Sequence, residues 1–230
     1  VVLLSKRTAD ALGVRVVDKN NLNLRVPVVK VEVDGHSVEG PAWIQPGLAD
    51  HTVGLALGFG RKRAGRVAQG AGFDAYPLRT SKTLHSASGA KLTLTGRTYP
   101  LSCTQNHWFM MGRSIVREAN LDEYRKDPHF AKAMNLEEPP SMKPIYPNPL
   151  DKLAEESLHQ WGLSVDLTKC VGCSACVVAC QSENNIPIVG KDQVRRNREM
   201  HWLRIDRYFT GSIEDPQVVN QPMMCQHCEA

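Results

Sequence analysis

Four of the seven cysteines lie in one short stretch, and their spacing is the strongest chemical signal in the sequence. The stretch reads Cys170-Val-Gly-Cys173-Ser-Ala-Cys176-Val-Val-Ala-Cys180, with intervals of two, two and three residues. Thiolates are soft ligands that suit zinc, copper(I) and iron–sulfur clusters. These intervals are typical of 4Fe–4S binding, in which the first three cysteines hold one cluster and the fourth reaches a second one. The stretch therefore predicts iron–sulfur ligation.

A second cysteine pair, Cys225 and Cys228, extends the set of candidate metal ligands. A zinc-binding interaction module could combine this pair with Cys173 and Cys176. Zinc pairs are usually separated by about 15–20 residues, however, and these two pairs lie much farther apart. A c-type haem needs Cys-x-x-Cys-His, which neither pair provides. Iron–sulfur binding is favoured for all six cysteines, and zinc remains the alternative.

The composition is that of an ordinary globular protein. Hydrophobic residues make up 42% of the 230 residues and charged residues 23%, which is enough for one large domain or two smaller ones. The net charge of +4 is mild, so nucleic acid is not expected as a partner. No apolar run approaches the length of a membrane span. Because the chain begins Val1-Val2 and ends just after Cys228, we interpret it as a segment of a longer protein.

Residues 1–105 are expected to form a β-rich domain. From Arg15 onward the pattern is that of strands, with the β-branched Val26, Val28, Val31 and Val33 before Asp34-Gly35, which predicts a tight hairpin turn. Ser88-Gly89 predicts a second hairpin, which would join residues 83–87 to residues 91–95. Short strands with turns between them are typical of a barrel or a sandwich.

Three other stretches complete the expected organisation. Ser5 and Gly13 are residue types that begin and end a short helix. Residues 106–162 are expected to form a helical and proline-rich connector, because a dense run of prolines suits neither a helix nor a central strand. Residues 163–230 hold the six candidate ligands, and Leu163–Asp166 is expected to be a short strand that leads into them.

The remaining candidates for chemistry give weaker signals. The stretch Gly58-Phe59-Gly60-Arg61 opens a glycine-rich, basic loop that could cradle a phosphate, but it matches neither a Walker loop nor a dinucleotide-binding fingerprint. A flexible surface loop is the favoured interpretation. His51 and His85 have no partners at ligand spacing. No nucleophile–base pair and no paired carboxylates are evident, so no catalytic residue is assigned.

These motifs resemble a known family. Cys170–Asn185 resembles the first cysteine motif of the four-cluster ferredoxin subunits that serve molybdopterin oxidoreductases, and Met224–Ala230 resembles the opening of their second motif. Residues 14–80, which include Pro46–Val53, are similar to the C-terminal domain of molybdopterin enzymes, a double-psi-type β-barrel that contacts the pterin dinucleotide. The fusion of the two parts resembles the large iron–sulfur subunit of alternative complex III.

The resemblance implies a mixed α+β fold, with a double-psi-like barrel over residues 1–105 and the beginning of a ferredoxin-like iron–sulfur domain over residues 163–230. It implies an electron-transfer subunit of a membrane-associated quinol:acceptor oxidoreductase that relays electrons through 4Fe–4S clusters. In that family the first three cysteines of this motif share one cluster, Cys180 contributes to another, and Cys225 and Cys228 begin a third. Each cluster would need ligands beyond Ala230.

The same resemblance implies partners and a location. The partners would be a quinol-oxidising membrane subunit and a cytochrome c subunit, on the periplasmic side of the bacterial inner membrane, with membrane contact only through those partners. Molybdopterin is expected to be absent. An active molybdopterin oxidoreductase, whose barrel still binds the pterin dinucleotide, remains the alternative.

Overall fold

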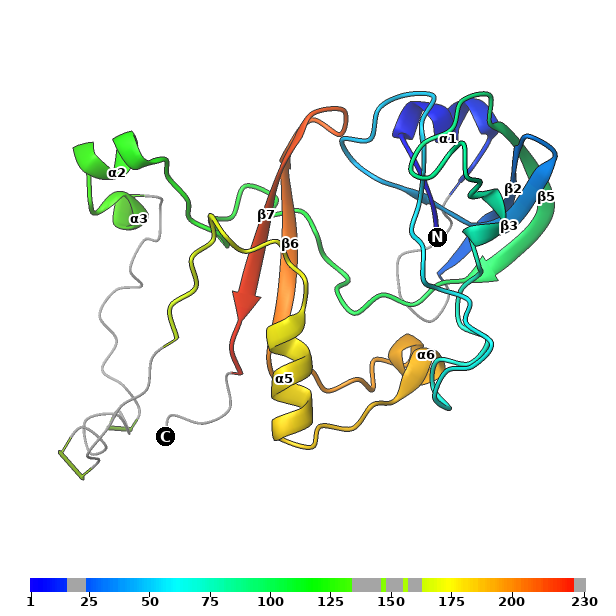
Figure 1. Ribbon diagram of the computed structural model, residues 1–230. Helices are drawn as coiled ribbons and strands as arrows, with labels where there is room; N and C mark the ends of the chain where they lie inside the picture. Colours follow the sequence, from blue (N-terminus) through cyan, green and yellow to red (C-terminus); the bar gives the residue numbers. More distant parts are fainter. Residues whose placement is uncertain (16–23, 134–145, 148–154, 157–162, 226–230) are drawn as a thin grey trace. The chain divides into compact units, whose positions relative to one another are not determined.

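A computed structural model describes residues 1–15, 24–133, 146–147, 155–156 and 163–225 (Figure 1). The chain divides into two compact units. The first, here called the sheet unit, consists of Val1–Asn106, Pro187–Met200 and Gly211–Gln217. The second, here called the cysteine unit, consists of His107–Ile186, His201–Thr210 and Val218–Ala230. Within the predicted connector, residues 106–133 are described, whereas the proline-rich run lies outside the described residues except for Tyr146 and Pro147.

The sheet unit is built on a five-stranded mixed sheet with the order β4-β1-β3-β2-β5. Its strands are β1 (Val2–Leu4), β2 (Arg25–Val33), β3 (His36–Ile44), β4 (Val53–Leu55) and β5 (Lys91–Pro100). Strands β1 and β3 are parallel, and the other neighbouring pairs are antiparallel. Strands β4 and β5 therefore form the two edges. The double-psi barrel and the ferredoxin-like domain remain predictions.

The hairpin between β2 and β3 confirms the prediction made from Asp34-Gly35. Val33 pairs with His36 across a two-residue turn, and both turn residues have positive φ, 48° for Asp34 and 78° for Gly35. A turn with two left-handed residues matches the right-handed twist of the flanking strands, which explains the preference for aspartate followed by glycine.

The hairpin predicted at Ser88-Gly89 is wrong. Residues 83–87 form no strand, although Gly89 does have a positive φ of 77°. Strand β5 pairs instead with β2, where Leu94 lies opposite Val29 and Leu92 opposite Val31. Such cross-strand pairs stabilise a sheet through their side chains. The segment before Gly89 has one large apolar residue, Leu84, and its side chain is exposed.

The core of the sheet unit lies between the sheet and the helix α1 (Lys6–Leu12). The prediction of this helix is confirmed: Ser5 accepts a hydrogen bond from the Thr8 N–H at 3.1 Å, and Gly13 ends the helix in the left-handed conformation. Ala9 of α1 packs with the buried strand residues Val2, Leu4, Val29, Val31 and Ala42. The unit also contains the 3-10 helix η1 (Tyr76–Leu78) and the helix α6 (Gly190–Arg195).

The cysteine unit combines short helices with a two-stranded hairpin (Figure 1). Its elements are α2 (Leu121–Lys126), α3 (Phe130–Ala133), α5 (Ala175–Glu183), β6 (Arg204–Gly211) and β7 (Pro216–Met223), with the hairpin end, Gly211–Gln217, belonging to the sheet unit. Phe109 forms an isolated parallel bridge with Phe209 of β6, supported by a 2.8 Å hydrogen bond from the Phe209 N–H to the Trp108 carbonyl. Across the described ranges, we find no helix with the length and apolar character needed to cross a membrane.

Candidate iron–sulfur site

Four of the predicted ligands lie in and around α5. Cys170 and Cys173 belong to the loop before the helix, and Cys176 and Cys180 belong to the helix itself. Cys173 and Cys176 are exposed, whereas Cys170 and Cys180 are half-buried. None of the four takes part in a disulfide within the described part of the chain. Their thiols therefore remain available as metal ligands.

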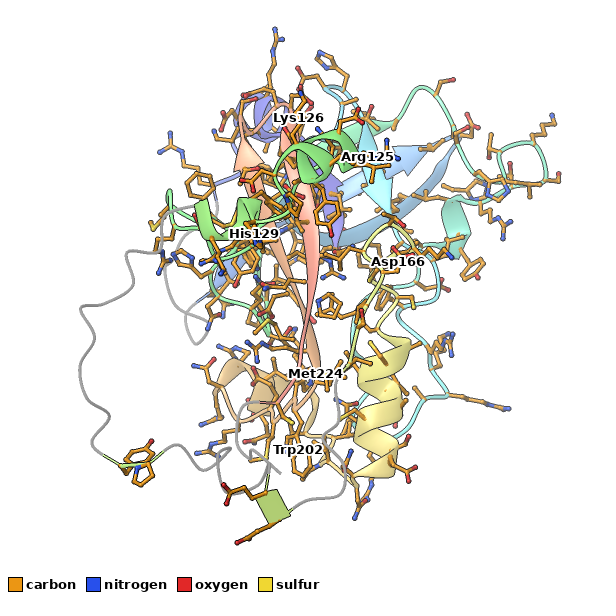
Figure 2. All side chains as sticks on the ribbon, turned by 90° about the vertical axis from the view of Figure 1, so that its left-hand side faces the viewer. Arg125, Lys126, His129, Asp166, Trp202 and Met224 are labelled. Carbon is orange, nitrogen blue, oxygen red and sulfur yellow. The ribbon has the colours of Figure 1, made fainter. Side chains whose placement is uncertain are left out.

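The chain enters this loop through a turn at Asp166, so the strand predicted at Leu163–Asp166 is wrong (Figure 2). The Asp166 carboxylate accepts hydrogen bonds from the Thr168 N–H at 3.0 Å and from its hydroxyl at 2.6 Å. The Asp166 carbonyl accepts from the N–H groups of Lys169 and Cys170, both at 3.1 Å. Aspartate favours such local turns over an extended strand because its side chain competes for nearby N–H groups.

Two left-handed residues shape the loop. Gly172 has φ 65° and Ser174 has φ 63°. A Cβ atom added at Gly172 would lie 3.1 Å from the Asn220 Nδ2 atom, so the loop passes close to β7. Gly172 is therefore required for two reasons: the backbone conformation strains other residues, and the neighbouring side chain leaves little room.

The backbone N–H groups of this loop are a further feature that suits an anionic cluster. Within the described residues, none of the N–H groups from Val171 to Val177 has a hydrogen-bond acceptor. The next residue, Val178, donates to the Ser174 carbonyl at 3.0 Å. Loops that contain left-handed residues can gather N–H groups into anion-binding concavities, which are used in many iron–sulfur sites. The donor set of thiols and N–H groups thus fits an iron–sulfur cluster.

The helix sets the separation between the third and fourth cysteines. Cys176 and Cys180 are four residues apart in α5 and so lie on one face, one turn apart, about 6 Å along the axis. Val177 is the buried residue of the helix. An offset of one turn is consistent with Cys180 serving a different cluster from the first three cysteines.

Cys225 follows the end of β7, the strand whose Asn220 side chain lies against Gly172. It is exposed, and Met224 beside it is labelled in Figure 2. Cys228 lies outside the described residues. In the part of the chain that the structure describes, no three histidine, cysteine, aspartate or glutamate side chains are grouped closely enough to hold a metal ion.

The sequence patterns assign no role to two residues that contact this site, Asn184 and Asn220. Asn184 ends α5 and donates from Nδ2 to the Cys180 carbonyl at 3.0 Å, with the same nitrogen 3.6 Å from the Cys180 Sγ atom. Its position four residues after a ligand in a helix is a signal that could have identified it. Asn220 is distant in sequence from the loop that it contacts, so no local pattern indicates it.

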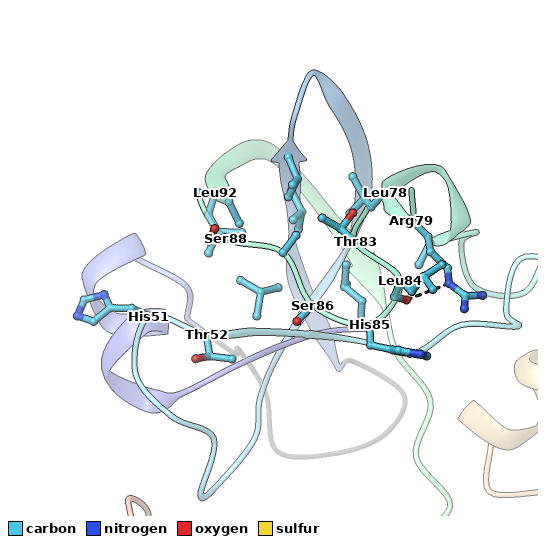
Figure 3. A pocket seen from close by; sticks show the side chains of 18 of the residues that line it. His51, Thr52, Leu78, Arg79, Thr83, Leu84, His85, Ser86, Ser88 and Leu92 are labelled. Atoms are coloured by element: carbon cyan, nitrogen blue, oxygen red, sulfur yellow. Dashed lines mark hydrogen bonds between the residues drawn. The ribbon is translucent and has the colours of Figure 1, made fainter. Parts of the chain in front are cut away.

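The sheet unit contains a groove of about 890 Å³ (Figure 3). His51 and His85, for which the sequence offers no partners, both line it and are exposed. The Arg79 Nε atom, also in the lining, donates to the Leu84 carbonyl at 2.9 Å. The groove belongs to a different unit from the predicted cysteine ligands. Among its described lining residues, no group of side chains is suited to hold a metal ion.

The glycine-rich basic loop is closed on itself by a 3.2 Å hydrogen bond from the Gly60 N–H to the Ala71 carbonyl. Arg61 is exposed, and its Nε atom donates to the Gly58 carbonyl at 3.1 Å. A Cβ atom at Gly60 would lie 2.4 Å or less from two backbone atoms, the Phe73 carbonyl carbon and the Asp74 nitrogen. This crowding explains why residue 60 is a glycine, and the explanation does not require a bound phosphate.

Comparison with known proteins agrees with the class that the cysteine site indicates. No protein-family model matches the chain. It is similar to the iron–sulfur cluster-binding subunit of menaquinone reductase from Nitratidesulfovibrio vulgaris, with 37% identity over 70 residues, or 30% of this chain and 27% of the relative. The iron–sulfur subunit of arsenate respiratory reductase from Shewanella sp. is 34% identical over 68 residues, or 30% of this chain and 25% of the relative.

A shorter match of higher identity is a selenate reductase subunit from Mesobacillus selenatarsenatis, with 64% identity over 28 residues, or 12% of this chain and 10% of the relative. The chain thus spans about a quarter of the length of the first two relatives. The cysteine spacing predicts an iron–sulfur subunit of an oxidoreductase. The relatives from Nitratidesulfovibrio vulgaris and Shewanella sp. are of this class.

Proposed function

We propose that this chain is part of an electron-transfer iron–sulfur subunit of a membrane-associated quinol:acceptor oxidoreductase similar to alternative complex III. The observation that supports this most directly is the cysteine loop, in which thiols that are close together in the sequence and form no disulfide accompany N–H groups that have no acceptor within the described residues. The relatives, which are iron–sulfur subunits of reductases, support the same class.

In this proposal the six cysteines serve three 4Fe–4S clusters. Cys170, Cys173 and Cys176 hold one cluster, Cys180 contributes to a second, and the Cys225–Cys228 pair begins a third. The remaining ligands come from outside these residues. A bound cluster supplies one-electron transfer, and the thiolates and N–H groups around it influence its reduction potential.

The chain's own residues hold and orient the thiols. The Asp166 turn positions the backbone of Cys170, because the Asp166 carbonyl accepts a hydrogen bond from the Cys170 N–H. Gly172 and Ser174 bend the loop, and α5 carries Cys176 and Cys180 on one face. Since the sequence offers no evident nucleophile–base pair, we assign this chain electron transfer and not bond-making chemistry.

We also propose a location and partners for the whole protein. We place it on the periplasmic side of the inner membrane, attached through a quinol-oxidising membrane subunit, with a cytochrome c subunit as a further partner. The sheet unit is proposed to carry no molybdopterin. The family resemblance of residues 14–80 and 170–185 is the support for this setting.

Elemental analysis of the full-length protein, isolated without oxygen, tests the proposal. We expect iron and acid-labile sulfide in equal amounts, with neither zinc nor molybdenum at one equivalent. One equivalent of zinc without iron would favour the interaction module. Molybdenum at one equivalent would favour an active molybdopterin enzyme. A preparation that lacks both iron and sulfide would overturn the proposed function.

A further inference from the structure

The side chain of Asn184 lies next to the fourth cysteine of the motif. Its Nδ2 atom is 3.0 Å from the Cys180 carbonyl oxygen and 3.6 Å from the Cys180 Sγ atom. An asparagine amide carries two N–H groups on this nitrogen, so one can bond the carbonyl while the other points to the sulfur. The backbone N–H of Asn184 also donates to the Cys180 carbonyl at 3.0 Å, which holds the residue in place.

We propose that Asn184 sets the reduction potential of the cluster that Cys180 ligates, by donating a hydrogen bond from its side-chain amide to the Cys180 thiolate. This inference rests on the proposed function, because it requires a cluster at Cys180. It concerns only the cluster served by Cys180, and it leaves the one held by Cys170, Cys173 and Cys176 unchanged.

The direction of the effect follows from charge. When a cluster accepts one electron, its ligand sulfurs become more negative. A hydrogen-bond donor stabilises the more negative state more strongly, since bonds to charged acceptors are stronger than bonds to neutral ones. Hydrogen bonds to the sulfurs are among the factors that set the potential of iron–sulfur clusters. The amide of Asn184 therefore makes its cluster easier to reduce.

A purely structural role for Asn184 makes a different prediction. As the residue that ends α5, it could serve only to satisfy the Cys180 carbonyl. In that case its replacement would loosen the end of the helix without changing a potential. The contact of the same nitrogen with Sγ distinguishes the two roles.

Ser182 provides a matched control on the same helix. Its hydroxyl donates to the Ala179 carbonyl at 3.0 Å, and it is exposed, as Asn184 is. Among the described residues it makes no hydrogen bond to a cysteine sulfur. Ser182→Ala therefore removes a side-chain bond to a carbonyl of α5 without removing a donor to a ligand.

The experiment is a redox titration of the full-length protein, followed by electron paramagnetic resonance of each reduced cluster. In Asn184→Ala we expect the equilibrium constant for reduction of one cluster to fall by up to about tenfold. For a one-electron couple this makes the potential of that cluster more negative by up to about 59 mV. Asn184→Asp, which replaces the donor with a negative charge, should shift the same cluster further. Ser182→Ala should leave all potentials unchanged.

Unchanged potentials in Asn184→Ala and Asn184→Asp, with iron fully retained, would overturn this inference and leave the proposed function intact. Loss of iron from both variants would also overturn it, because it would show that Asn184 acts structurally. Absence of iron from the wild-type protein would instead refute the proposed function, and this inference with it.

Discussion

The sheet unit and the cysteine unit differ in how many of their side chains are buried. In the sheet unit Val2, Leu4 and Val29 are each 0% exposed, and they belong to one core cluster. Among the described residues of the cysteine unit, the buried apolar side chains are three: Val177, Ile186 and Val219, at 5–8% exposure. The two units therefore have different sources of stability.

The difference in burial indicates which unit can fold without a cofactor. Burial of apolar surface is the main favourable term in folding, and the sheet unit has a contiguous core that provides it. The cysteine unit has little such burial among its described residues, and small metal-binding domains commonly depend on the metal for folding. We therefore expect cluster binding to stabilise the cysteine unit and to matter little for the sheet unit.

Removal of the clusters should have the largest effect. When an iron chelator is added to the full-length protein without oxygen, we expect the amides of α5 to lose their protection from hydrogen exchange, because the cluster bonds no longer hold the loop and helix. The amides of β2 should keep their protection, and they serve as the internal control. Equal protection of α5 before and after chelation would remove the proposed difference between the units.

A core substitution should show the opposite pattern. Leu4 is fully buried, and Leu4→Ala should lower the free energy of unfolding of the sheet unit by about 3 kcal/mol, through lost burial and the cavity left behind. Leu57 is 40% exposed, so Leu57→Ala is the matched control and should cost about 0.5 kcal/mol or less. Hydrogen exchange of β2 amides under denaturant measures both. The iron content should not change, and a loss of iron in Leu4→Ala would contradict the separation of the units.

Gly172→Ala should weaken the cysteine unit alone. The left-handed conformation disfavours alanine by about 1–2 kcal/mol, and the added Cβ would press on Asn220. We expect faster loss of iron to a chelator. Gly89→Ala is the control, because Gly89 also has positive φ but has no atom within 4 Å of an added Cβ and lies in the sheet unit. Iron release at the wild-type rate in Gly172→Ala would show that the loop conformation is not needed for binding.

The smallest expected effect concerns Cys103, a cysteine of the sheet unit that is not a predicted ligand. Burial raises the pKa of the Cys103 thiol above its ordinary value. The folded state thus holds this proton more tightly than the unfolded state. The stability that the thiol contributes is therefore fully present below the ordinary pKa of the thiol. It is lost as the pH rises through the raised pKa of the folded state. As the pH rises through that range, the urea concentration at the midpoint of unfolding should fall slightly more steeply for the wild type than for Cys103→Ala. Parallel pH profiles would contradict the raised pKa.

The sequence indicated the elements that local chemistry determines. Ser5 and Gly13 cap α1 as predicted, and the Asp34-Gly35 turn forms the β2–β3 hairpin. Each depends on residues that are neighbours in the chain. The cysteine spacing is equally local, and its agreement with iron–sulfur relatives follows from the same kind of signal.

The errors and omissions arise where distant segments meet, or where a side chain competes for the backbone. In the pairing of β5 with β2, Leu92 lies opposite Val31 and Leu94 opposite Val29. No turn residue in the sequence indicates that these two strands pair. The strand predicted at Leu163–Asp166 failed because the Asp166 side chain bonds locally. The closeness of Asn220 to Gly172 is a contact between a strand and a loop that neither local pattern specifies.

The most direct test of the central assignment compares two cysteine variants by electron paramagnetic resonance of the reduced full-length protein. Cys173→Ser should abolish or alter the signal of one cluster, because Cys173 is one of its proposed ligands. Cys103→Ser should leave all signals as in the wild type. Identical spectra for the wild type and Cys173→Ser, with equal iron content, would contradict the assignment of this loop as a cluster site.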